Sequence, residues 1–126
     1  QLIMGKKLKC HCEKVELEID LQEEGFKKLM RCNCSLCKRK GAVMSPIEKD
    51  KVKILKGQEN LKIYQYHTKV AEHYFCSICG IYTHHIMRSN PKMAGINVAC
   101  IEGVNPFELG DIPVNDGINH PLDQKK

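Results

Sequence analysis

The eight cysteines of this 126-residue chain constrain its fold more than any other feature, because seven of them fall in three short clusters. The clusters are CHC at residues 10–12, CNCSLC at residues 32–37 and CSIC at residues 76–79. Cysteines two apart on a strand point the same way but lie too far apart for a relaxed disulfide. Short paired clusters far apart in sequence are typical of zinc sites. We therefore expect zinc, not a disulfide framework, and a reducing compartment, by default the cytoplasm.

The number of cysteines indicates two zinc ions per chain, held in sites of different kinds. A tetrahedral zinc ion takes two of these short clusters, so two clusters make one closed site and the three thiols of CNCSLC remain. A structural zinc ion is saturated by four protein ligands, whereas a catalytic zinc ion has three and keeps a position for water or substrate. The odd third thiol therefore predicts one closed site and one open site.

Two alternatives stay open at the second site. Cys100 could complete it, which would make both sites structural, although an isolated cysteine in an apolar strand is more often a small buried hydrophobic residue. Histidines near the clusters could also contribute: His11, His73, His84 and His85. The last two are adjacent in YTHHIM, and neighbouring strand residues point to opposite faces, so at most one of them faces a site.

Alternation of apolar and charged residues predicts several strands. In KVELEID the apolar residues alternate with acidic ones, the period of a strand with one exposed face: Val15, Leu17 and Ile19. The pattern recurs at residues 51–55 and 60–67. Because a turn signal at residues 57–60 separates these two segments, they are predicted to form a hairpin.

The remaining segments complete the prediction of a mainly β fold. Residues 94–103 read as one more strand with Ile96, Val98 and Cys100 on one face. SLCKRKG predicts a single helical turn with Ser35 as its N-cap and Gly41 at its end. Residues 104–126 are rich in Pro, Gly, Asn and Asp and predict an ordered loop that wraps the body, followed by a frayed end. We expect one zinc-binding domain over residues 1–126.

Charge and hydropathy exclude several classes of partner. The formal charge is +5, but seven thiolates with two zinc ions would lower it to about +2. The one tight basic cluster, KRKG at residues 38–41, is too short for a nucleic-acid surface. No apolar run approaches the roughly 18 residues of a membrane span. The opening QLIMGKK places its basic residues after the apolar ones, unlike a secretory signal peptide.

Five motifs together resemble the glutathione-dependent formaldehyde-activating enzymes and their relatives, which include centromere protein V. They are CHCEKVELEI, RCNCSLCKRKGA, HYFCSICGIYTHH, RSNP and INVACIEG, between residues 5 and 103. The resemblance implies a β-tent fold of small antiparallel sheets organised around zinc. It also implies which cysteines share a site. The structural zinc would be bound by Cys10, Cys12, Cys76 and Cys79, and the catalytic zinc by Cys32, Cys34 and Cys37.

The activity implied by the resemblance is that of a carbon–sulfur lyase resembling S-(hydroxymethyl)glutathione synthase, which condenses glutathione with formaldehyde. Because glutathione carries two carboxylates, a basic rim is expected, and the candidate residues are Lys38, Arg39, Lys40, Arg88, Ser89 and Asn90. The alternative is a non-catalytic zinc-binding interaction module of the centromere protein V type.

One departure from the family pattern lies in the first cluster, where Glu13 stands in place of the usual glycine. In the last cluster, Gly80 predicts a left-handed turn that frees backbone N–H groups toward sulfur.

Overall fold

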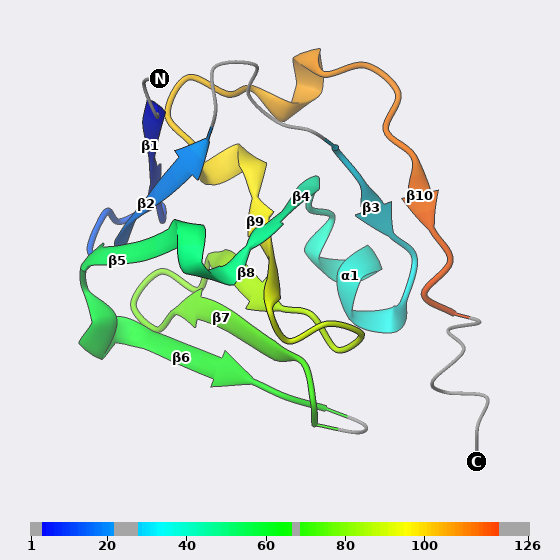
Figure 1. The fold of residues 1–126 in the computed structure, drawn as a ribbon, viewed down its shortest axis with the longest axis horizontal. Helices are drawn as coiled ribbons and strands as arrows, with labels where there is room; N and C mark the ends of the chain where they lie inside the picture. Colours follow the sequence, from blue (N-terminus) through cyan, green and yellow to red (C-terminus); the bar gives the residue numbers. More distant parts are fainter. Residues whose placement is uncertain (1–3, 22–27, 67–68, 119–126) are drawn as a thin grey trace.

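The computed structural model describes residues 4–21, 28–66 and 69–118, and it confirms the mainly β fold class built from small antiparallel sheets (Figure 1). One sheet has three strands in the order β1-β2-β5, and a second has five in the order β4-β9-β8-β7-β6. Both are antiparallel throughout. The strands of the two sheets are β1 (Met4–Lys9), β2 (Glu16–Leu21), β5 (Val52–Lys56), β4 (Met44–Glu48), β9 (Met93–Asn97), β8 (Tyr82–Ile86), β7 (Glu72–Cys76) and β6 (Leu61–Tyr64).

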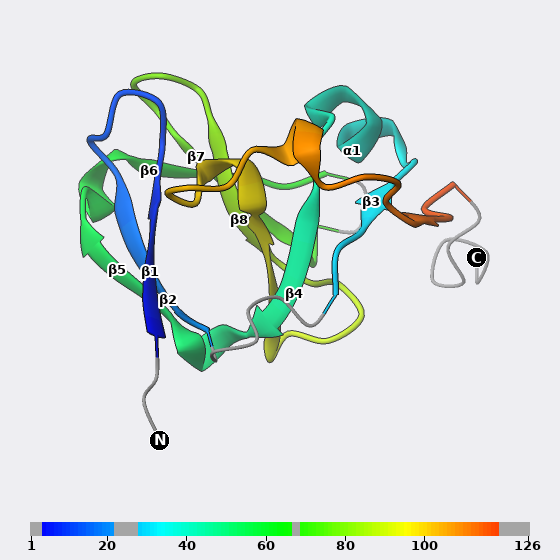
Figure 2. The same ribbon diagram turned by 90° about the horizontal axis from the view of Figure 1, so that it is seen from above.

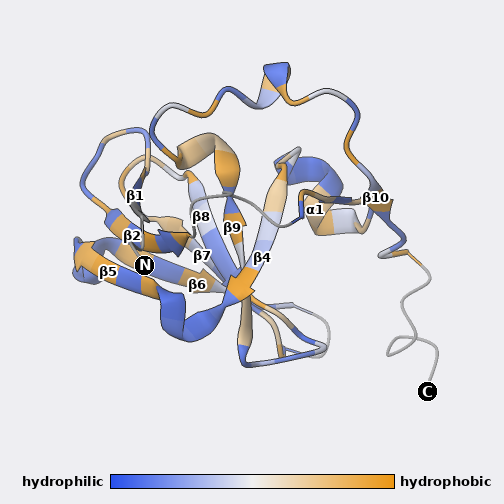
Figure 3. Ribbon diagram, turned by 45° about the horizontal axis from the view of Figure 1, so that its top comes forward, coloured by the Kyte–Doolittle hydropathy of each residue, from blue (hydrophilic) through white to orange (hydrophobic). Residues whose placement is uncertain are grey.

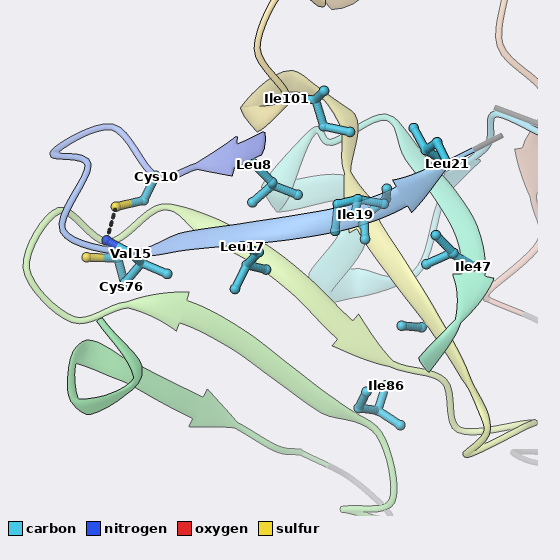
Figure 4. Close-up of a cluster of buried hydrophobic side chains, with 12 residues drawn as sticks. Leu8, Cys10, Val15, Leu17, Ile19, Leu21, Ile47, Cys76, Ile86 and Ile101 are labelled. Atoms are coloured by element: carbon cyan, nitrogen blue, oxygen red, sulfur yellow. Dashed lines mark hydrogen bonds between the residues drawn. The ribbon is translucent and has the colours of Figure 1, made fainter. Parts of the chain in front are cut away.

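The main core lies where the two sheets face each other. Buried residues alternate with partly exposed acidic ones, as the sequence pattern predicted for Val15, Leu17 and Ile19, and Leu21 at the end of β2 continues the alternation. They pack against apolar side chains from β1, β4, β8, β9 and the turn after β9, and the sulfurs of Cys10 and Cys76 lie at one end of this cluster (Figure 4). Burying each large aliphatic side chain contributes about 1.5–3 kcal/mol, so this core holds the sheets together.

The predicted hairpin between residues 51–55 and 60–67 is wrong. β5 pairs with β2, whereas β6 pairs with β7, so the two segments belong to different sheets. The chain crosses between the sheets at Gly57, whose φ is +83° and where a Cβ would collide with the carbonyl of Lys14. An alternating pattern shows that a segment forms a strand, but it carries no information about which strand will be its partner.

The strand expected at residues 94–103 ends early. β9 stops at Asn97, because the side-chain oxygen of Asn97 accepts a hydrogen bond from Ala99 N and begins a 3₁₀ turn, Val98–Cys100. Three other 3₁₀ turns lie in the described residues, at Lys49–Lys51, Gln58–Asn60 and Pro106–Glu108.

A short helix, α1 (Ser35–Lys40), follows the two-residue strand β3 (Arg31–Cys32). Its N-cap is Cys34, one residue earlier than the predicted Ser35. Gly41 ends the helix as predicted, with φ +65° and its N–H bonded to the carbonyl oxygen of Cys37. The C-terminal part of α1 is hydrophilic (Figure 3).

The C-terminal segment crosses the body and returns to β3. There β10 (Val114–Asn115) pairs with β3 in parallel, so the two strands run side by side next to α1 (Figures 1 and 2). The expected ordered loop is therefore present as far as residue 118, and the expected frayed end lies outside the described residues. Within the described ranges, the chain has no helix long and apolar enough to cross a membrane.

Candidate metal centres and the adjoining cavity

The first candidate centre brings together four cysteines from two distant parts of the chain, near the N-terminus and past its middle. Their Sγ atoms all lie within 4.8 Å of one another: Cys10, Cys12, Cys76 and Cys79. The Sγ of Cys12 is 3.6 Å from that of Cys10 and 3.7 Å from that of Cys76. Tetrahedral zinc with bonds of about 2.3 Å places its sulfurs roughly 3.8 Å apart. The cluster therefore has the ligand type, number and spacing that zinc requires.

Backbone turns aim these sulfurs inward. The N–H of Val15 donates to Cys10 Sγ at 3.4 Å, and the N–H of Ile78 donates to Cys76 Sγ at the same distance. Gly80 has φ +80° and its N–H donates to Cys76 O, which confirms the turn predicted for this cluster. At the first cluster Glu13 takes a left-handed conformation with φ +63°, so the turn forms without the glycine usual in the family.

Hydrogen bonding prepares one of these thiols for a cation. Although burial opposes ionisation of Cys79, backbone N–H groups of Cys12 and Ile81 donate to it, and with the neighbouring thiols they lower its pKa to about 6. Cys79 is thus a thiolate at neutral pH, the form that binds zinc.

The second candidate centre is made by the central cluster. The Sγ atoms of Cys32, Cys34 and Cys37 also lie within 4.8 Å of one another. Cys34 caps α1, and its sulfur accepts a hydrogen bond of 3.2 Å from Cys37 N. The hydrogen bond with the Cys32 thiol, burial and the negative charges of Cys32 and Cys34 raise the pKa of Cys37, although the charge of Lys40 opposes this shift. A bound cation would offset this mutual repulsion, so the three sulfurs suit a metal ion.

Cys100 belongs to neither cluster in the part of the chain that the structure describes. Its sulfur lies 3.7 Å from Tyr82 O and 3.5 Å from Asn97 Nδ2. Burial raises the pKa of Cys100 to about 12. The thiol is therefore neutral and packed, in agreement with the favoured interpretation. No fourth Cys, His, Asp or Glu among the described residues joins the three-cysteine cluster.

A cavity of about 200 Å³ adjoins the three-cysteine cluster. Its wall includes all three cysteines of that cluster and none of the other four. Residues from β4, β7 and β8, from the loops next to the strands and from the C-terminal segment complete it. The remaining lining residues are Met30, Met44, Tyr66, Ala71, His73, His85, Met87, Arg88, Ser89, Asn115 and Gly117.

The histidine pair divides as strand alternation predicts. His85 lines the cavity, whereas His84 stacks on Tyr74 away from it, with ring centroids 4.5 Å apart. The ring of His85 fits only because residue 95 is glycine, since a Cβ there would collide with it. The Tyr82 hydroxyl lies 2.6 Å from Nδ1 of His85.

A half-buried lysine adjoins this histidine wall. Lys40 Nζ is 2.9 Å from Nδ1 of His73 and 3.6 Å from the centroid of the Tyr82 ring. Because lysine is a donor only, it donates and His73 Nδ1 accepts. Burial, together with the lysine charge, lowers the pKa of His73 to about 4 and that of His85 to about 3. Both imidazoles are thus neutral hydrogen-bonding groups at neutral pH.

The structure separates the predicted rim residues into three groups. Arg88 and Ser89 line the cavity. Lys38 and Arg39 lie on the exposed face of α1 outside the cavity lining, and Arg39 Nη1 donates to Ser35 O at 2.7 Å. Asn90 is exposed and caps a turn, because its Oδ1 accepts from Lys92 N.

Sequence reasoning did not single out two tyrosines near the cluster. Tyr66 places its hydroxyl 3.7 Å from Cys34 Sγ, and Tyr82 contacts both Lys40 and His85. Lys40 was expected at a solvent-exposed rim but packs inward instead. The histidines near the cysteine clusters, His73 and His85, were the sequence signal for this wall, whereas the tyrosines lie in strands and loops where aromatic residues are common.

Comparison with known proteins agrees with this architecture. The profile of the family described as glutathione-dependent formaldehyde-activating enzyme matches residues 6–109. A crystal structure of a Rhodobacter sphaeroides protein, from a structural genomics programme, is 48% identical and superposes with a TM-score of 0.82, covering 86% of this chain and 99% of that chain. Because the family match spans most of the chain and includes every cysteine of both clusters, this protein belongs to the glutathione-dependent formaldehyde-activating enzyme family.

Proposed function

We propose that this protein is a zinc-dependent enzyme that makes or breaks a carbon–sulfur bond between a thiol such as glutathione and an aldehyde such as formaldehyde. The observation that carries the proposal is the asymmetry of the two centres. Three cysteines face a cavity of about 200 Å³, whereas the four-cysteine cluster has a full ligand set and takes no part in that wall. A zinc site with four protein ligands is typical of a structural role, whereas a site with an open position beside a cavity is typical of a catalytic role.

In this proposal Cys10, Cys12, Cys76 and Cys79 hold a structural zinc ion, and Cys32, Cys34 and Cys37 hold a catalytic one. The second ion would supply a coordination position for an incoming thiol and lower the pKa of that thiol. Tyr66 supports the sulfur ligand set, since its hydroxyl lies 3.7 Å from Cys34 Sγ.

The size of the cavity determines which part of a thiol enters it. Pockets for drug-sized ligands measure roughly 300–1,000 Å³, so a cavity of about 200 Å³ takes the cysteinyl end of glutathione and leaves the carboxylates outside. Arg88 and Ser89 line the cavity, and in this proposal they contact the carboxylates at its mouth. Lys38 and Arg39, on the exposed face of α1, would add a positive field, with Asn90 on the turn after Ser89.

The condensation requires one proton transfer and no redox partner. The thiol sulfur forms a bond to the carbonyl carbon, the carbonyl π bond breaks, and the proton released by the thiol ends on the new hydroxyl oxygen. His85 and His73 line the same cavity as neutral imidazoles, so they are suited to hydrogen-bond that oxygen.

A reducing compartment, the cytoplasm, fits this function. All eight cysteines are free thiols, and seven must stay reduced to bind metal. In this proposal residues 1–126 act as one zinc-binding domain, with a small-molecule thiol as its partner and no nucleic acid.

The test is the rate of S-(hydroxymethyl)glutathione formation, followed by NMR exchange between labelled formaldehyde and its glutathione adduct. Zinc-loaded protein should exceed the spontaneous rate, and Cys34→Ser should return the rate to that background. Cys100→Ala is the matched control, because this cysteine lies in neither cluster, and it should retain the wild-type rate. If exposed basic residues attract the carboxylates of glutathione, raised salt should weaken the binding of glutathione more than the binding of a small neutral thiol.

Cobalt substitution gives a second readout at the sulfur ligands. Titrating glutathione into the cobalt form should strengthen the sulfur-to-cobalt charge-transfer bands, since each added sulfur ligand contributes. The enzyme proposal fails if the protein does not raise the rate of adduct formation with any thiol and no thiol changes the cobalt charge-transfer bands. The protein would then be better described as a zinc-binding interaction module of the centromere protein V type.

A further inference from the structure

The C-terminal segment at residues 113–118, called here the strap, packs directly on the three-cysteine loop. Val114 and Asn115 pair in parallel with Arg31 and Cys32. The loop donates two backbone hydrogen bonds to the strap, from Arg31 N to Pro113 O at 2.8 Å and from Asn33 N to Asn115 O at 3.2 Å. A segment more than eighty residues away in sequence therefore holds the backbone on either side of Cys32.

Asn33 ties the strap to the site with its side chain. Its Oδ1 accepts hydrogen bonds from Gly117 N at 2.7 Å and from Ile118 N at 3.2 Å. Asn33 stands between two of the three sulfur-bearing residues, so anchoring this side chain restricts the loop on which both neighbours are mounted. Partners just outside a ligand set typically change metal affinity about 10–100-fold when removed.

Gly117 brings the strap closer to the sulfurs than any other residue type would allow. A Cβ at this position would lie 2.5 Å from Cys32 Sγ and 2.8 Å from Cys34 Cβ. The φ of Gly117 lies outside the left-handed range, so alanine is compatible with the backbone and only the contact with the cysteines forbids it. Gly117 and Asn115 both line the cavity, and Asn115 Nδ2 lies 3.0 Å from Met30 Sδ in the same wall.

The strap also lies outside the part of the chain that matches the family. That match ends at residue 109, whereas the strap begins at residue 113. The cysteines thus come from the shared family core, and one wall of their cavity comes from a segment beyond it.

We propose that the strap is a positioning and specificity element of the three-cysteine site: it fixes the loop through Asn33, and through Gly117 it sets the room beside Cys32 and Cys34. The first half of this statement concerns metal binding by the chain itself. The second half rests on the proposed function, since it takes a thiol to be the molecule that enters the cavity.

The first experiment measures zinc affinity by competition with a chelator, with no activity assay, so it stands even if the proposed function fails. Asn33→Ala should lower the affinity for the more labile of the two zinc ions about tenfold or more. The affinity for the tighter ion should not change. Asn33→Asp, which keeps acceptor oxygens for Gly117 N and Ile118 N, should restore most of that affinity. Phe107→Ala is the control, because this side chain is 95% exposed and lies outside the strap.

The second experiment uses Gly117→Ala in the cobalt form. The added methyl should shift the charge-transfer bands of the three-cysteine site. It should also lower the affinity for glutathione at least fivefold more than the affinity for hydrogen sulfide, the smallest sulfur probe. Phe107→Ala should match wild type in both affinities. If Gly117→Ala does not fold, the Asn33 pair and Asn115→Ala test the same wall. The proposal is overturned if every soluble strap variant has a zinc affinity and a thiol discrimination within twofold of those of Phe107→Ala.

Discussion

The hydroxyl group of Tyr82 lies 2.6 Å from Nδ1 of His85, and this contact orients an imidazole ring that lines the cavity of the three-cysteine cluster. Tyr82 is buried, and burial raises its pKa well above the ordinary value, so the phenol stays protonated. Its ring also lies under Lys40 Nζ. One side chain therefore supports two neighbours by different interactions, a hydrogen bond and a cation–π contact.

Tyr82→Phe separates these two interactions, because phenylalanine keeps the ring beneath Lys40 and removes only the hydroxyl. Leaving Nδ1 of the partly buried His85 without this partner should lower the free energy of unfolding by about 1–3 kcal/mol. Urea unfolding of the zinc-loaded protein measures the change. Tyr64→Phe is the matched control, since Tyr64 is half exposed, and it should stay within about 0.5 kcal/mol of wild type. Equal stability of the two variants would contradict a structural role for this hydrogen bond.

The two metal centres should differ in what their loss does to folding. Cys12 and Cys76 place their sulfurs 3.7 Å apart although they are 64 positions apart in sequence, so a zinc ion there closes a long loop. The apparent free energy of binding a structural zinc ion is about 10–16 kcal/mol, which is comparable with the free energy of unfolding of a whole domain. Cys76→Ser should therefore give insoluble or unfolded protein.

Cys34→Ser should instead lose the second zinc ion and keep a cooperative thermal transition. Its ligand partners lie within six residues, so that ion closes only a short loop. Mass spectrometry of the native protein, with calorimetry, measures both effects: about two zinc ions in wild type and about one in Cys34→Ser. A collapse of Cys34→Ser as complete as that of Cys76→Ser would show that the second centre is structural.

Glu13 offers a stabilising substitution. It adopts φ +63°, a left-handed conformation that costs roughly 1–2 kcal/mol for a residue with a Cβ, and its side chain is exposed. Glu13→Gly should remove this strain, offset in part by the greater freedom of glycine in the unfolded chain, for a net gain of about 0.5–1 kcal/mol. Thermal unfolding at fixed free zinc measures it. Glu59→Gly, another exposed glutamate but without a positive φ, should destabilise.

His84 should make stability depend on pH. Burial lowers the pKa of His84 from 6.5 to about 4. Above pH 6.5 both folded and unfolded states hold a neutral ring. As pH falls below 6.5 the unfolded chain takes up the proton first, so the free energy of unfolding falls by up to about 1.4 kcal/mol per pH unit until pH 4.

His84→Phe removes this dependence while keeping an aromatic ring to stack on Tyr74. Between pH 7.5 and pH 5, wild type should lose about 2 kcal/mol more than the variant. Urea unfolding at matched free zinc gives both curves, and the difference cancels the common effect of acid on the metal sites. Parallel curves for the two proteins would show that His84 ionises as easily when folded as when unfolded.

Local features of this chain were readable from its sequence. The alternation in β2 and the left-handed glycines at residues 41 and 80 depend on neighbours a few positions away, so short-range periodicity and turn chemistry predict them. The clustered cysteines likewise indicated metal, because each cluster is a local turn that aims its sulfurs at one point. The resemblance to a family implied the pairing of the first and last clusters, and the structure brings the same sets together.

Only the tertiary structure decided which distant segments meet. The sequence predicted strands at residues 51–55 and 60–67, where β5 and β6 lie, but it did not show that β5 pairs with β2 and β6 with β7. In the same way, nothing local to Gly117 or Lys40 places one against Cys32 and the other against Tyr82 and His73. Local propensity is set by the energetics of a few adjacent residues. The walls of the cavity are set by packing of the whole chain, in which every long-range contact depends on the others.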